Sequence, residues 1–257
     1  MGWDNRTFRL GDGMAVRLPS AAAYAPQIPK EHRWLPVLAP QLPLAVPVPL
    51  ALGQPGEGYP WHWSINKWLP GEPLGAFGPL QAQGLADFLK ALQGLDVSGG
   101  PEAGADNFHR GGSLRVYDSQ TRDAIALLGS QIDAAAAGCV WEAALATRHE
   151  GPPAWLHGDI SPANLLVDDG ELAGVIDFGC CAVGDPSCDL AIAWTGMDRR
   201  GREAFRDALP LDEGCWARAR GWALWKSLLE CAGLSAARPA ARTRGFAALE
   251  EVLNGDG

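Results

Sequence analysis

One short segment of the sequence holds residues of the types that phosphoryl transfer requires. Asp159 is followed five residues later by Asn164, and Asp177 stands thirteen residues beyond Asn164. A carboxylate can orient an acceptor hydroxyl and take its proton, while a carboxamide and a second carboxylate can hold Mg²⁺, which prefers oxygen ligands. We therefore expect Asp159 to face an acceptor, and Asn164 and Asp177 to face a metal ion.

Short apolar runs on both sides of this segment predict the elements that position it. The runs 165–167 and 172–176 flank Asp168-Asp169-Gly170, a turn signal between two strands. Such a hairpin returns the chain beside Asn164 and places Asp177 there. The alternative is a surface loop in which Asp159, Asn164 and Asp177 only cap helices or form turns. A surface loop explains less well why the three residues occur in this order on the two sides of a hairpin.

The first 70 residues predict a small lobe. Residues 7–10 and 14–18 alternate around an Asp-Gly turn and predict a hairpin, and 28–38 predict a helix. The Pro-rich run 36–49 predicts an extended connection, and 59–69 is β-prone. Pro70-Gly71-Glu72-Pro73 then breaks the pattern. We place a lobe boundary there, with a nucleotide-binding lobe over 1–70 and a catalytic, substrate-binding lobe over 71–257.

The rest of the chain predicts mainly helix. Leucine and phenylalanine recur at helical spacing over 80–95, a Gly-rich loop covers 98–112, and an Ala-rich stretch predicts one long helix over 121–147. Three short β-like pieces follow at 154–156, 165–167 and 172–176, and the sequence beyond 185 predicts helices alone. Strands first and helices later predict an α+β fold with a small antiparallel sheet lobe, and the early position of the hairpin suggests that this lobe is shortened.

Composition excludes several classes of protein. The chain has 257 residues and a formal charge of −9, from 21 Lys and Arg against 30 Asp and Glu. Nucleic acid is therefore not expected as a partner, because a phosphate backbone demands a basic surface. No run is long and apolar enough to span a membrane. Six cysteines without a C-x-x-C pair predict free thiols in a reducing cytoplasm.

The segment around Asp159 resembles a known family. His157-Gly158-Asp159 through Asn164, followed by Ile176-Asp177-Phe178-Gly179, is similar to the catalytic loop and metal-binding strand of aminoglycoside phosphotransferases. The stretches 3–19, 67–72 and 184–191 also resemble this family, which is similar to protein kinases in fold and includes relatives such as macrolide and choline kinases. The resemblance implies a kinase-like fold of two lobes and a phosphotransferase acting on an alcohol group.

The resemblance also assigns roles. Asp159 would be the catalytic base, and Asn164 and Asp177 would bind Mg²⁺ beside a bound ATP or GTP. Arg17 stands where kinases usually have a lysine, so it would hold phosphate oxygens with Glu31 as its partner. The remaining roles fall on the purine-binding backbone of Trp68, on His157 and Asp189 as supports of the catalytic loop, and on Trp222, Trp225 and Glu230 as walls of the acceptor pocket.

The predicted function is Mg²⁺-dependent transfer of the γ-phosphate of ATP or GTP to a hydroxyl of a small molecule. An aminoglycoside-like antibiotic is the first choice, with a cationic acceptor held by carboxylates such as Asp198, Glu203 and Glu230. Alternatives are a macrolide, a choline-like amino alcohol or a homoserine-like metabolite. A nucleotide-binding pseudokinase or scaffold is the alternative of another class, suggested by how close the chain's start lies to the nucleotide loop. The oligomeric state stays open.

Overall fold

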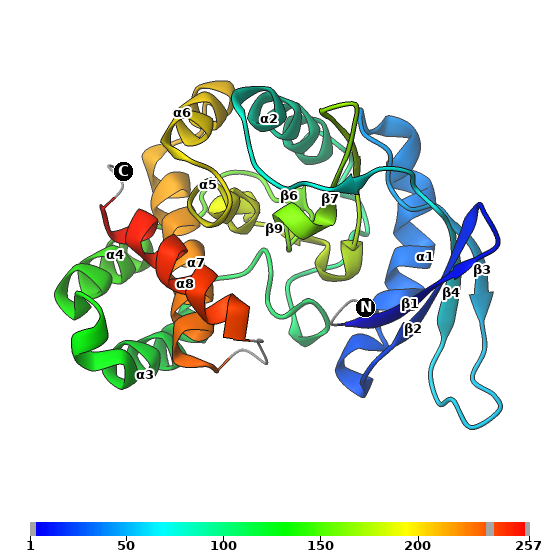
Figure 1. The fold of residues 1–257 in the computed structure, drawn as a ribbon, viewed down its shortest axis with the longest axis horizontal. Coiled ribbons are helices and arrows are strands. Elements are labelled where there is room, and N and C mark those ends of the chain that lie inside the picture. The colour runs from blue at the N-terminus through cyan, green and yellow to red at the C-terminus, as the bar shows by residue number, and fades with distance from the viewer. Residues whose placement is uncertain (1–3, 235–238, 255–257) are drawn as a thin grey trace.

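A computed structural model describes residues 4–234 and 239–254 of the chain. Figure 1 shows a twisted sheet at one end of the molecule and a group of helices at the other, with short strands between them. This arrangement confirms the α+β class that the sequence predicted.

The sheet has four antiparallel strands in the order β1-β2-β4-β3. The predicted hairpin is present as β1 (Asn5–Leu10) and β2 (Met14–Pro19), which turn through Gly11 at a positive φ of 59°. β4 (Trp63–Lys67) pairs with β2, and β3 (Pro49–Gly53) forms the far edge. β1 lies at the other edge. β3 was not predicted, because a half-exposed edge strand carries no regular alternation.

Helix α1 (Gln27–Leu38) joins the sheet to the centre of the molecule. It packs against β3 and against the short turn η7 (Phe178–Cys180). The helix predicted over 28–38 is present and begins one residue earlier, but the extended connection predicted over 36–49 starts too early, because residues 36–38 are helical. Proline removes only its own amide hydrogen bond, and the helix closes at Ala39, whose N–H donates to the Leu35 carbonyl.

The central strands form two small sheets. β6 (Ala154–Leu156) pairs with β9 (Ala182–Gly184), and β5 (Glu72–Pro73) adds to the hairpin of β7 (Leu165–Asp168) and β8 (Glu171–Val175). Asp169 and Gly170 both have positive φ, 47° and 83°. These are the angles of a type I′ turn, whose twist matches a two-residue hairpin. The hairpin predicted from the sequence is therefore confirmed.

The helical part surrounds one hydrophobic core. Its largest fully buried side chains are Trp141, Trp155, Phe88, Phe178 and Phe205. Burial of such side chains contributes roughly 1.5–3 kcal/mol each. The helices are α2 (Pro79–Gln93), α3 (Asp118–Leu128), α4 (Ala134–Ala146), α5 (Ile192–Thr195), α6 (Arg199–Ala208), α7 (Glu213–Ala232) and α8 (Pro239–Asn254).

The single helix predicted over 121–147 is wrong, because the chain forms α3 and α4 there instead. Gly129 has a positive φ of 52°, which an α-helix does not contain. Asp133 then begins α4 as its N-cap, and its side chain accepts the Ala136 N–H at 2.9 Å. The alanines extend the helical periodicity across a break that one glycine and one capping residue create.

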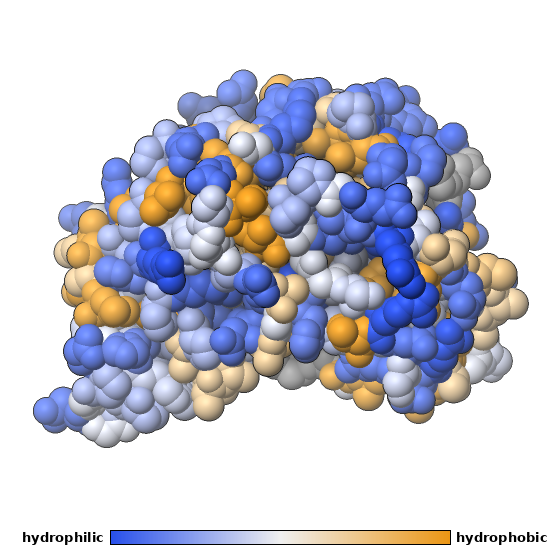
Figure 2. Space-filling view, turned by 180° about the vertical axis from the view of Figure 1, so that it is seen from behind, coloured by the Kyte–Doolittle hydropathy of each residue, from blue (hydrophilic) through white to orange (hydrophobic). Residues whose placement is uncertain are grey.

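The surface carries its apolar residues in separate groups. Figure 2 shows the face opposite to that of Figure 1, where hydrophilic residues surround several hydrophobic patches. The exposed large hydrophobic residues include Phe8, Val37, Leu80 and Leu127, which come from four different elements. Within residues 4–234 and 239–254, no helix has both the length and the apolar character needed to cross a bilayer.

Candidate active site

The loop between β6 and β7 holds Asp159 in a fixed position. The backbone N–H groups of His157 and Gly158 donate to the two carboxylate oxygens of Asp189, both at 2.7 Å. Asp189 is fully buried, and burial raises its pKa. Gly158 has a φ of 88° and lies against the Cys180 carbonyl, so any larger residue would collide there. The structure thus places Asp189 where the sequence expected a support of the loop.

The imidazole of His157 is a second support. Its Nδ1 accepts the backbone N–H of Asp159 at 3.1 Å, which leaves the proton on Nε2. Nε2 then donates to the carbonyl of Ile176 at 3.0 Å, and the ring packs edge-on against Phe178. This buried ring therefore links Ile176, which precedes Asp177, to Asp159.

The three residues singled out from the sequence lie close together. Asn164 Nδ2 donates to the Asp159 carbonyl at 2.9 Å and lies 3.3 Å from its Oδ2. The Ile176 N–H donates to the Asn164 carbonyl at 2.9 Å, which puts Asp177 directly beside this loop. Asp177 adopts a left-handed φ of 69°, uncommon for a residue with a side chain.

This donor set fits a Mg²⁺ ion. Among the residues that the structure describes, Asn164 Oδ1 and Asp177 Oδ2 accept no hydrogen bond, so both oxygens are available as ligands. No group of three or more His, Cys, Asp or Glu side chains forms a metal site in that part of the chain. Mg²⁺ keeps several waters and phosphate oxygens as ligands, so one or two protein oxygens suffice.

A further carboxylate adds to the negative charge here. Burial raises the pKa of Asp4, and the charges of Asp177 and Asp159 raise it further, to about 6. Three carboxylates thus lie close enough to repel one another, an arrangement that a cation would relieve. Sequence reasoning placed Asp4 in the stretch 3–19 that resembles the family but did not single it out as a site residue.

Arg17 connects the sheet to this centre. Its guanidinium donates to Glu31 Oε2 at 2.5 Å and to Asp177 Oδ1 at 2.6 Å. Burial opposes the positive charge of Arg17, but the carboxylates of Glu31 and Asp177 outweigh it and raise its pKa. The pairing of Arg17 with Glu31 that the sequence suggested is present, and the contact with Asp177 is additional.

Two cations that were not predicted lie beside Asp159. Lys226 Nζ donates to Asp159 Oδ1 at 3.0 Å, and Arg110 Nε donates to the Gly158 carbonyl at 2.9 Å. Burial raises the pKa of Asp159, but Lys226 and Arg110 together outweigh it and lower the pKa to about 2. A signal for Lys226 existed, since it lies one helical turn from both Trp222 and Glu230 on α7.

Trp222 and Trp225 form a wall of the pocket beside Asp159. This pocket has a volume of about 20 Å³, enough for roughly one water molecule. Both tryptophans are largely buried, and the Arg110 guanidinium lies 4.9–5.0 Å from their ring centroids. Tyr117 stacks on Trp225 at 4.2 Å. The tryptophans therefore combine core packing with a small face toward Asp159.

The acidic side chains expected around a polycation do not converge. Glu230 lies near enough for Asp159 to influence its pKa, which burial raises. Asp198 is the N-cap of α6 and accepts the Gly201 N–H at 2.7 Å. Glu203 is exposed and pairs with Arg199 at 3.0 Å. None of Asp198, Glu203 and Glu230 lines the pocket beside Asp159, so the expectation that Glu230 forms part of its wall was wrong.

The backbone of Trp68 is only partly available for a purine. Its N–H already donates to the Gly13 carbonyl at 2.8 Å, because the chain leaves β4 alongside the β1–β2 turn. The expected purine contact is therefore limited to the Trp68 carbonyl and to neighbouring backbone. The indole ring lies 4.8 Å from the Arg9 guanidinium.

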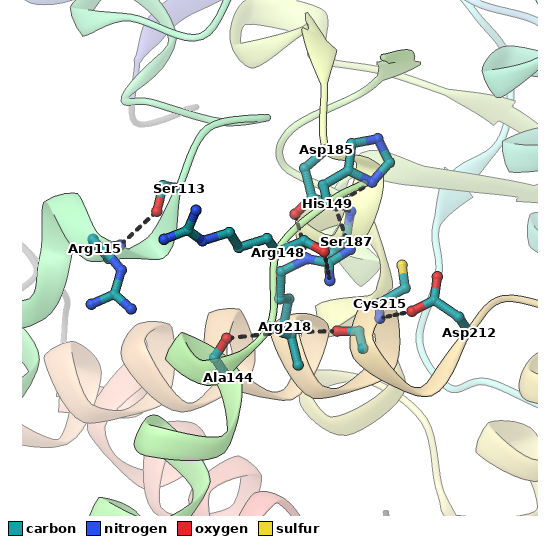
Figure 3. Close-up of polar contacts among 12 residues, drawn as sticks. Ser113, Arg115, Ala144, Arg148, His149, Asp185, Ser187, Asp212, Cys215 and Arg218 are labelled. Atoms are coloured by element: carbon teal, nitrogen blue, oxygen red, sulfur yellow. Dashed lines mark hydrogen bonds and ion pairs between the residues drawn. The ribbon is translucent and has the colours of Figure 1, made fainter. Parts of the chain in front are cut away.

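Asp185 has a structural position. Its Oδ1 accepts the Ser187 N–H at 3.1 Å, and its Oδ2 accepts from Arg218 Nε at 2.6 Å. Figure 3 shows this buried pair between α7 and the segment after β9. The Ser187 contact makes Asp185 the N-cap of the short helical segment Pro186–Ala191.

Comparison with known proteins identifies the family and the fold of this chain. The profile of the phosphotransferase enzyme family matches residues 1–222. Comparison with curated proteins found no match.

Several solved structures share the fold. The GDP and kanamycin complex of APH(2")-IIia superposes with a TM-score of 0.76 at 19% identity, covering 98% of this chain and 90% of that one. The macrolide 2'-phosphotransferase MphH from Brachybacterium faecium gives 0.61 at 25% identity, covering 100% and 91%. ADP-bound APH(2'')-Ib gives 0.60 at 18% identity, covering 99% and 90%. The kinase-like α+β fold expected from the sequence is confirmed.

Proposed function

This chain belongs to the phosphotransferase enzyme family, and we propose that it transfers the γ-phosphate of ATP or GTP to a hydroxyl of a small molecule. The observation that carries the proposal is the convergence of Asp159, Asn164 and Asp177 at one end of the β7–β8 hairpin. A scaffold that only bound nucleotide would need no carboxylate aligned beside the metal ligands. The intact set therefore supports catalysis.

Asp159 supplies the base in this proposal. With a pKa of about 2 its carboxylate is charged throughout the physiological range. It accepts the proton of the acceptor hydroxyl while that oxygen forms a bond to the γ-phosphorus. The bond from the γ-phosphorus to the bridging oxygen breaks, and the nucleoside diphosphate leaves with that electron pair.

Asn164 and Asp177 would hold Mg²⁺, and Arg17 would hold phosphate oxygens. When bound, Mg²⁺ supplies positive charge that offsets the charge of the phosphate chain. Arg17 already contacts one oxygen of Asp177, so it can move to the phosphates when a metal takes over that carboxylate. We place the lobe boundary at residue 70, supported by the change of sheet between β4 and β5.

An aminoglycoside is the first acceptor to consider, because a solved structure with the same fold is a kanamycin complex. The charges around Asp159 favour a second candidate, an acceptor with few or no positive charges. Lys226 and Arg110 lie beside Asp159, while Asp198 and Glu203 point elsewhere. Cations repel a polycation and attract a neutral or carboxylate-bearing hydroxy compound. A macrolide and a homoserine-like metabolite meet this condition better than an aminoglycoside does.

The deciding experiment measures Mg²⁺-dependent consumption of ATP and GTP with a panel of acceptors. The panel holds aminoglycosides, macrolides, choline and homoserine. We expect acceptor-dependent turnover, and we expect Asp159→Asn to lower kcat by a factor on the order of 10²–10⁴. Nucleotide affinity should stay the same in that variant.

The matched control is Asp198→Asn, the same change at a residue that caps a helix, a role asparagine also fills. It should keep full activity. Equal turnover of the Asp159→Asn variant and the parent would refute the assigned base. A folded protein that binds nucleotide but turns over no acceptor would favour the scaffold.

A further inference from the structure

A second cavity lies away from the proposed active site. It has a volume of about 480 Å³. Its lining consists of residues 111–115, 144, 145, 147–149, 151, 153, 184, 185 and 218. It shares no lining residue with the pocket beside Asp159. Its volume lies in the range of pockets that hold small ligands, roughly 300–1,000 Å³. We call it the arginine cavity.

The charges of this cavity are opposite to those of the protein as a whole. Arg115, Arg148, His149 and Arg218 line it, against a single carboxylate, that of Asp185. Arg218 and Asp185 are both buried and neutralise each other at 2.6 Å. Two arginines therefore remain without a carboxylate at the cavity, in a chain whose formal charge is −9.

These two arginines have hydrogen-bond donors to spare. Arg115 uses one nitrogen, on the Leu145 carbonyl at 2.9 Å. The Arg148 guanidinium has no hydrogen-bond partner among the residues that the structure describes, and Figure 3 shows it extending toward Ser113 and Arg115. Ser113 accepts the Arg115 N–H, and its own hydroxyl proton is not donated within that part of the chain.

We propose that the arginine cavity binds a small molecule through a phosphate group. Two guanidinium groups and one hydroxyl offer N–H and O–H donors in one region of the cavity. The planar guanidinium group matches the spacing of phosphate oxygens. The rest of the cavity, walled by Leu114, Ala144 and Pro153, accommodates the body of a phosphate ester. A phosphorylated metabolite and free phosphate share this chemistry.

The test is calorimetric titration of the purified full chain at constant ionic strength. The probes are phenyl phosphate, inorganic phosphate and phenol. We expect phenyl phosphate to bind and phenol not to bind. The double variant Arg115→Gln/Arg148→Gln should weaken phenyl phosphate binding by about tenfold or more, because each charge-assisted contact is stronger than a neutral one.

Two controls separate this site from the active site and from general charge effects. Arg199→Gln removes an exposed arginine that is paired with Glu203 on α6, outside the lining of the cavity, and should leave phenyl phosphate binding unchanged. The affinity for ADP with Mg²⁺ should be the same in the double variant and in the parent.

Tighter binding of phenyl phosphate than of inorganic phosphate supports a phosphate ester as the ligand, and equal binding supports free phosphate. Equal phenyl phosphate affinity of the parent and the double variant would overturn the proposal, as would the absence of binding in the parent. Because both arginines are exposed, the variants should fold, which circular dichroism verifies.

Discussion

At the level of single residues, the contact between Lys226 and Asp159 has the largest consequence for pH dependence. The lysine keeps the pKa of Asp159 at about 2 although burial raises it. In Lys226→Met burial still raises the pKa of Asp159, while the largest effect that lowers it is lost, so this pKa rises from about 2 toward the ordinary range of a carboxylate. Since Asp159, the proposed base, must be deprotonated to act, we expect the acidic limb of kcat/KM to move to higher pH.

A pH profile of kcat/KM for the parent and for Lys226→Met checks this prediction. The control is Lys90→Met, which removes an exposed lysine paired with Asp87 on α2. Its profile should overlay that of the parent. An acidic limb that stays in place in Lys226→Met would mean that Lys226 does not set the pKa of the base.

Sequence reasoning identified the residues that belong to ordered motifs. Asp159, Asn164 and Asp177 stand at fixed spacing with a hairpin between them, and the structure brings them together. Arg110 belongs to no motif and reaches the loop from an irregular segment. The helical spacing of Lys226 from Trp222 and Glu230 marks the side of α7 on which it lies, but not its contact with Asp159. Such contacts depend on how distant elements pack, which no local pattern records.

At the level of elements, the β7–β8 turn positions Asp177. Gly170→Ala should lower the free energy of unfolding by roughly 1 kcal/mol, because alanine at a φ of 83° is strained. Gly138→Ala is the matched control. Gly138 lies inside α4 with open space around it, so alanine should raise the free energy of unfolding by about 0.5–1 kcal/mol.

Urea denaturation of the two variants measures both changes. Opposite signs support the turn geometry that the structure shows. A Gly170→Ala variant as stable as Gly138→Ala would contradict the positive φ at that position.

Elements with strong local signals were predicted correctly, and those decided by longer-range pairing were not. The β1–β2 and β7–β8 hairpins and α2 follow from turn residues and helical spacing. β3 has only one strand beside it and lacks alternation. The break between α3 and α4 depends on Gly129, whose helix-ending conformation is not evident among so many alanines.

At the level of the whole molecule, Arg17 ties the sheet to the central strands. Arg17→Met leaves Glu31 buried and unpaired, so it should destabilise the protein by about 3–5 kcal/mol. Arg17→Met/Glu31→Met removes both charges and should recover most of the loss, since an apolar pair can replace a buried ion pair. Nucleotide affinity should remain weakened in both variants.

Thermal unfolding and nucleotide titration, measured side by side, separate the two roles of Arg17. The double variant serves as the stability-matched control for binding. If it binds nucleotide as tightly as the parent does, Arg17 only holds the sheet in place and does not contact phosphates.

The small pocket beside Asp159 bears on the reaction that competes with phosphoryl transfer in kinases, the hydrolysis of the bound nucleotide by water. Room for about one water molecule means that water can reach the base. Lys226 donates to one oxygen of the Asp159 carboxylate at 3.0 Å. An acceptor that displaced the lysine would free this carboxylate at the moment when its hydroxyl arrives. We expect the contact between Lys226 and Asp159 to favour the acceptor over water, the most abundant competing nucleophile.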